Sequence, residues 1–185
     1  MSGPRRSPQR KQDPLSRIIT LGDIDNENAC EVIGIINEIQ REDKAKEEDK
    51  REPIKLILNS CGGSVYDGFG IIDTIESSLT PVHIYIQGQA MSMAFAIATC
   101  GHYRCASKRS TFMYHEMLWE TAPEKLKYHE QELKEGKRIS QIYDEIVVEN
   151  TNIPLKTLQK VCNERKEWYM NAEEALKLGV IDEII

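Results

Sequence analysis

The chain alternates between short continuous runs of apolar residues and longer segments whose apolar residues recur every three or four positions. The first pattern is typical of buried strands and the second of helices. Strands are therefore expected at 17–21, 54–59, 82–87, 104–107 and 111–114, and around Val180. Helices are expected after 25 or 26, over 65–78, 91–100 and 123–150, from 154, and over 172–175. Strands that alternate with helices indicate a single α/β domain with a largely parallel sheet.

Two segments depart from this pattern. Residues 41–52 are almost all charged, so we expect a solvated helix end and a surface loop there, with no core residue. Residues 1–14 carry four basic residues among Ser, Pro and Gln, which is typical of a disordered basic tail, and residues 15–185 then form the domain. The tail lacks the apolar centre of a secretory signal, which favours a cytoplasmic protein.

Composition and charge exclude several classes of function. The net charge of −6 argues against nucleic acid or an anionic membrane as the main partner. No run approaches the roughly 18 apolar residues of a membrane span. Five scattered cysteines without a CxxC pair favour free thiols in a reducing compartment. The four histidines have no metal-binding spacing, so neither a metal nor another cofactor is expected.

Candidate chemistry gathers where three strands end, which is where α/β sheets place their functional loops. Ser92 has alanines two residues away on both sides and lies where a strand turns into a helix. This is the pattern of a nucleophile elbow, in which close packing excludes larger side chains. Free backbone amides at the helix start would favour a developing oxyanion. The alternative is that Ser92 only caps the helix.

Gly62-Gly63 and His115 follow the other two strand ends. The glycines would let the backbone approach a ligand, or they would simply form a strand-to-helix turn. A phosphate-binding loop is excluded because the GxxxxGK[ST] pattern is absent. His115 can act as a general base only if the fold brings it within hydrogen-bond reach of Ser92.

Four segments occur in the order found in one known family. They are Gly62-Gly63-Ser64-Val65, Gly88-Gln89-Ala90-Met91-Ser92-Met93, Met113-Tyr114-His115 and Met170-Asn171-Ala172-Glu173-Glu174-Ala175. From about Arg17 onward the chain resembles the Clp protease proteolytic subunit, in a shortened or phage-like form. The resemblance implies a crotonase-like stack of ββα units and the activity of a serine endopeptidase, which in this family is ATP-dependent.

The resemblance also implies a role for each site residue. Ser92 matches the nucleophile and His115 the base, while the backbone amides of Gly63 and Met93 match the oxyanion hole. The family's third residue is an Asp, and the matching position here is Glu167. This stretch is slightly longer than the family's, so Asn163 and Glu164 are alternatives. Glu167 could also be one charge on a solvated helix end.

The family assembles as stacked heptameric rings that enclose peptides or unfolded proteins. The resemblance therefore implies a homo-oligomeric ring, and the helix expected over 123–150 fits this because its apolar residues cover more than one face. These residues are Leu126, Leu133, Ile139, Ile142, Ile146 and Val147. The segment after His115 is shorter than the family's and has no glycine, and the axial loop is missing. Both differences weaken the case for ring stacking and for an AAA+ unfoldase partner.

Two other functions stay open. A crotonase-type acyl-CoA enzyme would share the fold and the two-amide oxyanion hole, but it would not need Ser92 and His115 together. An inactive structural subunit of a Clp complex would be expected to lack one residue of the triad. The ambiguity at Glu167 is the only feature of this sequence that favours it.

Overall fold

The computed structural model describes residues 17–117 and 126–185. Its strands are β1 Ile18–Leu21, β2 Ile54–Ser60, β3 Val82–Met91, β4 Tyr103–Ala106, β5 Thr111–Tyr114, β6 Trp168–Asn171 and β7 Glu183–Ile184. Its helices are α1 Asn26–Asp43, the 3-10 helix η2 Glu48–Lys50, α2 Val65–Glu76, α3 Met93–Thr99, α4 Leu126–Asn150, α5 Leu155–Asn163 and α6 Ala172–Lys177. Most strands pair in parallel, so the expected α/β class is confirmed.

The sheet divides along β3, which is long enough to take two neighbours on the same edge. Its first half pairs with β4 and its last residues, 89–91, pair with β5, both in parallel. The main path runs β1-β2-β3-β4-β7, and β5 also pairs antiparallel with β6. The end of β3 thus lies beside β5, which ends one residue before His115.

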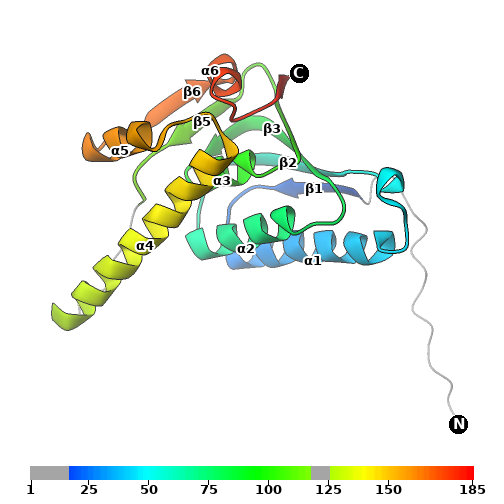
Figure 1. The fold of residues 1–185 in the computed structure, drawn as a ribbon, viewed down its shortest axis with the longest axis horizontal. Helices are drawn as coiled ribbons and strands as arrows, with labels where there is room; N and C mark the ends of the chain where they lie inside the picture. The colour runs from blue at the N-terminus through cyan, green and yellow to red at the C-terminus, as the bar shows by residue number, and fades with distance from the viewer. Residues whose placement is uncertain (1–16, 118–125) are drawn as a thin grey trace, which may run out of the picture.

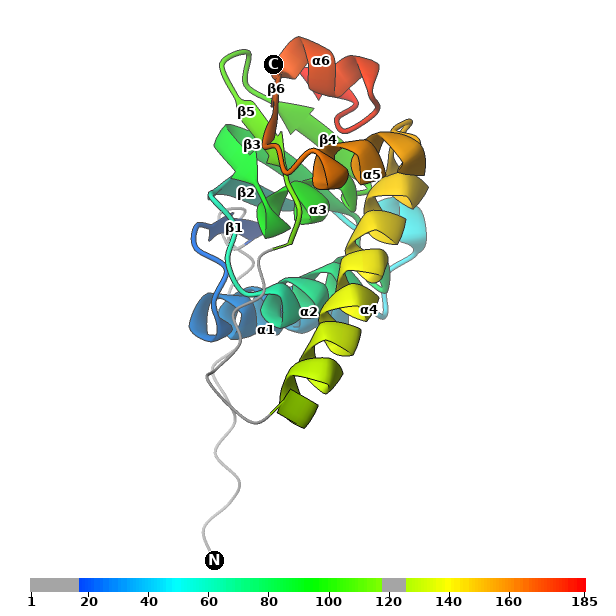
Figure 2. The same ribbon diagram turned by 90° about the vertical axis from the view of Figure 1, so that its left-hand side faces the viewer.

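The core lies between the sheet and the helices. Figures 1 and 2 show α1 and α2 side by side beneath one face of the sheet, where alternate residues of β2 and β3 are buried. Every residue of α3 is buried, as expected for a helix that is apolar on all sides. Burying a large apolar side chain of this helix, such as Phe95 or Ile97, contributes about 1.5–3 kcal/mol. The turn that begins α3 is therefore held by packing all around the helix.

The expectation that residues 41–52 hold no core residue is wrong. Helix α1 continues to Asp43, whose carboxylate is fully buried. Asp43 pairs with Arg17 at 2.6 Å and Lys46 at 2.7 Å, and it accepts a hydrogen bond from Thr80 Oγ1 at 3.0 Å. A carboxylate can enter a core when it is paired and hydrogen-bonded in this way.

The strand expected over 82–87 is longer than its apolar run. It continues through Met91, and α3 begins only at Met93. Gly88 has φ 107° and lies where the β2–β3 register shifts, between Leu58 and Ser60. The shifted strand then exchanges β4 for β5 as its neighbour, and the new ladder keeps residues 89–91 extended.

The C-terminal region differs from expectation in two places. Strand β6 was not predicted, because its partner β5 lies more than fifty residues earlier and local pattern does not show the pairing. The terminal strand lies at Glu183–Ile184 rather than around Val180. The expected basic tail at 1–14 and the expected helix start at Pro123 lie outside the described residues.

Asp43 gives the fold a specific dependence on pH. Burial opposes its ionisation, but the hydrogen bonds from Arg17, Lys46 and Thr80 outweigh burial and lower its pKa to about 2. A lowered pKa stabilises the folded state above the unfolded pKa, about 3.9, and this contribution is lost as the pH falls through about 2.

We therefore expect Asp43→Asn to lower the free energy of unfolding by about 3 kcal/mol at pH 7, because it removes the buried charge that Arg17 and Lys46 face. Denaturant titrations should show the difference from wild type shrinking between about pH 4 and pH 2. Asp49→Asn, at an exposed carboxylate of the same segment, is the control. An Asp43→Asn protein as stable as the control at pH 7 would contradict the expectation.

Candidate active site

Ser92 is the single residue between β3 and α3. Its backbone has φ 52° and ψ −126°, a conformation that costs a residue with a side chain about 1–3 kcal/mol. The Ser92 N–H donates to Met113 O at 2.9 Å, and the Ser92 C=O accepts from the Phe95 N–H at 2.9 Å. The side chain makes no capping hydrogen bond, so the alternative of a serine that only caps α3 does not hold.

His115 meets Ser92 across the β3–β5 pair. The distance between Ser92 Oγ and His115 Nε2 is 2.8 Å. The parallel register sets Met91 beside Met113. Ser92, which follows β3, and His115, which follows β5, therefore lie next to each other at the same edge of the sheet. Both side chains are half-buried. This is the distance at which a nucleophile can pass its proton to a base.

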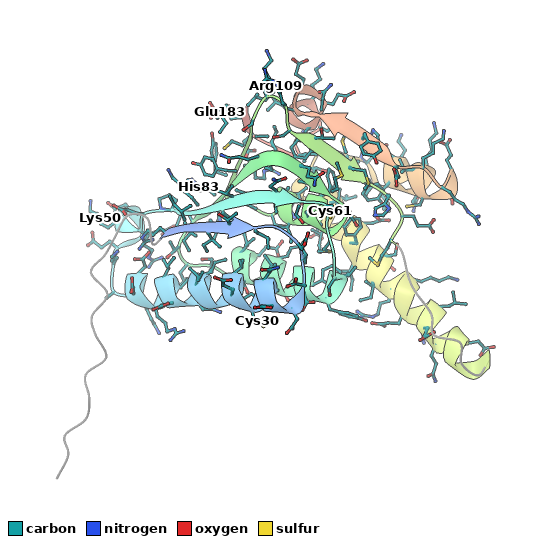
Figure 3. The ribbon with its side chains drawn as sticks, turned by 180° about the vertical axis from the view of Figure 1, so that it is seen from behind. Cys30, Lys50, Cys61, His83, Arg109 and Glu183 are labelled. Atoms are coloured by element: carbon teal, nitrogen blue, oxygen red, sulfur yellow. The ribbon has the colours of Figure 1, made fainter. Side chains whose placement is uncertain are left out.

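The loop after β2 lies directly against this turn. Figure 3 shows Cys61, at the start of the loop, at the opposite end of β2 from Lys50. Gly62 has φ 109° and Gly63 has φ 146°. A Cβ at Gly62 would lie 2.8 Å from Ser92 Cβ, and one at Gly63 would lie 2.1 Å from Ile24 O. Side chains are thus excluded at both positions, and the absence of one at Gly62 lets the loop backbone lie against Ser92.

Two backbone amides beside Ser92 have no partner within the described residues. The bridge between Gly63 and Ile24 consists of Ile24 N–H to Gly62 O at 3.1 Å and Ser64 N–H to Ile24 O at 2.7 Å, so it does not use the Gly63 N–H. Met93 is the first residue of α3, so no carbonyl of the helix lies one turn earlier to accept a hydrogen bond from its N–H. These amides are the two for which the resemblance to the Clp protease proteolytic subunit implies a role in an oxyanion hole.

Helix α4 contacts the site through a stack of buried tyrosines. Tyr143 Oη donates to Ser92 O at 2.9 Å, and its ring stacks on Tyr114 with centroids 5.6 Å apart. Tyr114 Oη in turn donates to Asp144 Oδ1 at 2.5 Å. Burial raises the pKa of both tyrosines, and the Asp144 carboxylate adds to the effect on each, so both hydroxyls keep their protons. Burial also raises the pKa of Asp144, which the bond from Tyr114 partly offsets.

The three candidates for the third residue are all exposed, and none has a hydrogen bond to His115 in the described structure. Glu167 accepts a hydrogen bond from Tyr169 Oη at 2.7 Å. Glu164 pairs with Lys166 at 2.9 Å, and Asn163 is the last residue of α5. The β5–β6 register pairs Tyr114 with Trp168, so a one-residue extension of the ladder would set Glu167 opposite His115. The backbone of Glu167 therefore lies at the register position opposite His115, although its carboxylate is bonded to Tyr169.

Sequence reasoning did not identify Tyr143, Tyr114 or Asp144. Tyr143 lies four residues from both Ile139 and Val147, so it continues the buried stripe of α4. A tyrosine on such a stripe is a usable signal, because a buried phenol needs a hydrogen-bond partner. The sequence does not reveal that this partner is the carbonyl of Ser92, more than fifty residues earlier.

The described residues contain no group of three or more His, Cys, Asp or Glu placed to hold a metal ion. Among the helices in the same residues, none combines the length and apolar character needed to cross a membrane.

A comparison with protein families matches residues 14–185 to the model described as Clp protease. The matched range includes the glycine loop, Ser92, His115 and the C-terminal segment with β6 and α6. It covers nearly the whole sequence, and it agrees with a mostly parallel sheet whose strand ends carry the site. The chain therefore belongs to the Clp protease family.

Proposed function

We propose that this chain is a serine endopeptidase in which Ser92 is the nucleophile and His115 the general base. The hydrogen bond of 2.8 Å between Ser92 Oγ and His115 Nε2 is the observation that carries the proposal. The strained backbone of Ser92 supports it, because such strain gathers at functional sites. Membership of the Clp protease family supports a peptidase as the reaction class.

The chemistry follows from the groups around Ser92. His115 Nε2 accepts the Ser92 hydroxyl proton while Oγ bonds to the carbonyl carbon of a peptide substrate. The carbonyl oxygen becomes an oxyanion that the N–H groups of Gly63 and Met93 stabilise. The C–N bond then breaks as His115 returns the proton to the leaving amine, which leaves an acyl-enzyme. Water repeats the same steps, with His115 taking its proton, and releases the acid.

The two other functions predict different reactions. A crotonase-type enzyme would turn over an enoyl-CoA and leave a peptide substrate intact, whereas an inactive subunit would do neither. Assaying the full chain with a fluorogenic peptide and with an enoyl-CoA separates all three. We expect hydrolysis of the peptide alone.

Removal of either partner of the Ser92–His115 pair should stop the reaction. We expect Ser92→Ala or His115→Ala to lower peptide turnover by at least about a thousandfold, because each change removes proton transfer from the nucleophile. A fluorophosphonate should label wild type at Ser92, as located by mass spectrometry, and should not label Ser92→Ala. Ser77→Ala, at an exposed serine that ends α2, should behave as wild type. A label on another residue, or an active Ser92→Ala protein, would refute the proposal.

We further propose that Glu167 orients His115 when substrate is bound, since its register position lies opposite that residue. Glu167→Gln should then lower turnover by at least about tenfold, and by more than Glu164→Gln or Asn163→Ala. Steady-state kinetics of the three variants test this. If Glu167→Gln leaves turnover unchanged while Glu164→Gln or Asn163→Ala lowers it strongly, the role belongs to the residue whose change lowers turnover. If all three variants keep wild-type turnover, Ser92 and His115 act as a dyad.

Assembly into a ring is the second part of the proposal, because Clp proteases generally form oligomeric rings. Two features of α4 support it: Leu133 is 58% exposed, and Figures 1 and 2 show the start of the helix extending beyond α2. Inside a ring, the chamber would admit peptides and unfolded chains and exclude folded proteins. A cytoplasmic location stays a prediction from the sequence, and the missing axial loop weakens the case for dependence on an AAA+ unfoldase.

Light scattering should give a mass about sevenfold that of one chain for a single ring and about fourteenfold for two stacked rings. Leu133→Glu should shift the mass toward that of one chain, because it buries a charge in the proposed contact. Leu79→Glu, at an exposed leucine before β3, is the matched control. A wild-type protein with the mass of one chain would contradict assembly.

A further inference from the structure

Ser92 and Met93 share a peptide group that serves the site on both of its sides. Its N–H, on Met93, is one of the two amides without a partner beside Ser92 within the described residues. Its C=O, on Ser92, accepts two hydrogen bonds, from Phe95 N–H and from Tyr143 Oη, each 2.9 Å long. Any group that holds this carbonyl therefore also sets the direction of the Met93 N–H, because the peptide group is planar.

Tyr143 is held firmly enough to act as such a group. It is only 4% exposed and stacks on Tyr114 with an angle of 20° between the ring planes. Tyr114 makes an edge-to-face contact with Phe95, in the first turn of α3, at 6.1 Å between centroids. The phenol thus approaches Ser92 O from a rigid aromatic stack rather than from a mobile side chain.

We propose that Tyr143 is a positioning residue for the oxyanion hole: its hydroxyl orients and polarises the Ser92–Met93 peptide group, so that the Met93 N–H points at the developing oxyanion. This inference rests on the proposed function. A carbonyl that accepts a second hydrogen bond makes the N–H of the same peptide group a stronger donor. The same bond also holds the strained φ of Ser92 against relaxation.

The size of the effect follows from the indirect role. Loss of a direct oxyanion-hole donor lowers kcat by about 100- to 1,000-fold. Tyr143→Phe keeps the Met93 N–H and removes only the bond behind it, so we expect a loss of about tenfold, well short of that range. The Ser92 carbonyl keeps its bond from Phe95 N–H, and the phenylalanine ring keeps the stack, so the substitution leaves no buried acceptor without a partner.

The test compares ground-state binding with binding of the tetrahedral state in the full-length protein. Kinetics with a fluorogenic peptide give kcat and KM, and binding of the product peptide gives the ground-state affinity. A peptide boronate forms a tetrahedral adduct on serine that occupies the oxyanion hole, so its affinity measures binding of the tetrahedral state. Tyr143→Phe should lower kcat and boronate affinity by the same factor and leave KM and product affinity within about twofold. Incorporating para-aminophenylalanine at position 143, which retains an N–H donor, should restore part of both.

Tyr66→Phe is the matched control, because it removes another tyrosine hydroxyl that contacts α4, through Glu135 at 3.1 Å, away from Ser92. It should match wild type in every measurement. A Tyr143→Phe enzyme with unchanged kcat and boronate affinity would overturn the inference alone. So would a parallel loss of product affinity, or a chain that fails to fold, because either would make the role of the hydroxyl purely structural. A wild-type protein without peptidase activity would overturn the proposed function and this inference together.

Discussion

The positive φ of Ser92 is the constraint on which the site depends. A residue with a side chain keeps this conformation only where its surroundings hold it there. Here Met113 O, in β5, accepts a hydrogen bond from the Ser92 N–H, and the Ser92 carbonyl accepts hydrogen bonds from Tyr143 Oη and Phe95 N–H. The buried helix α3 begins at the next residue. Gly62, in the loop after β2, can then lie against the turn because it carries no side chain. The backbone strain at Ser92 is thus balanced by hydrogen bonds with three separate elements, β5, α3 and α4.

The sequence predicted those parts of the structure that depend on neighbouring residues. The helix expected after residue 25 or 26 begins at Asn26, because Asp25 caps it with a short polar side chain. The strand before His115 was predicted with its observed bounds, and the alanines around Ser92 indicated a tight turn. Ser92, His115 and the glycine pair were therefore candidates from local pattern together with the family's motifs, whereas Tyr143 was not. The 2.8 Å contact between Ser92 and His115 required the fold.

What the sequence could not predict depends on pairing between distant residues. Asp43 was taken for a surface charge because nothing near it in sequence shows that Arg17 and Thr80 will surround it. The end of β3 was taken for a loop because the strand there is stabilised by β5 rather than by its own apolar residues. The same limit applies to Glu167. Its place in the register follows from the β5–β6 ladder, whereas its side-chain direction depends on a bond to Tyr169.

The position of β5 has a consequence for biosynthesis. One edge of this strand pairs with the end of β3, and its other edge pairs with β6, which is made more than fifty residues later. While the chain is being translated, the strand that leads to His115 can join Ser92 early, but it lacks its second neighbour until Asn171 has left the ribosome. A nascent chain of this design therefore holds β5 between two neighbouring strands only after β6 has been made. The order of translation thus places the completed arrangement of β3, β5 and β6 after the synthesis of α4 and α5.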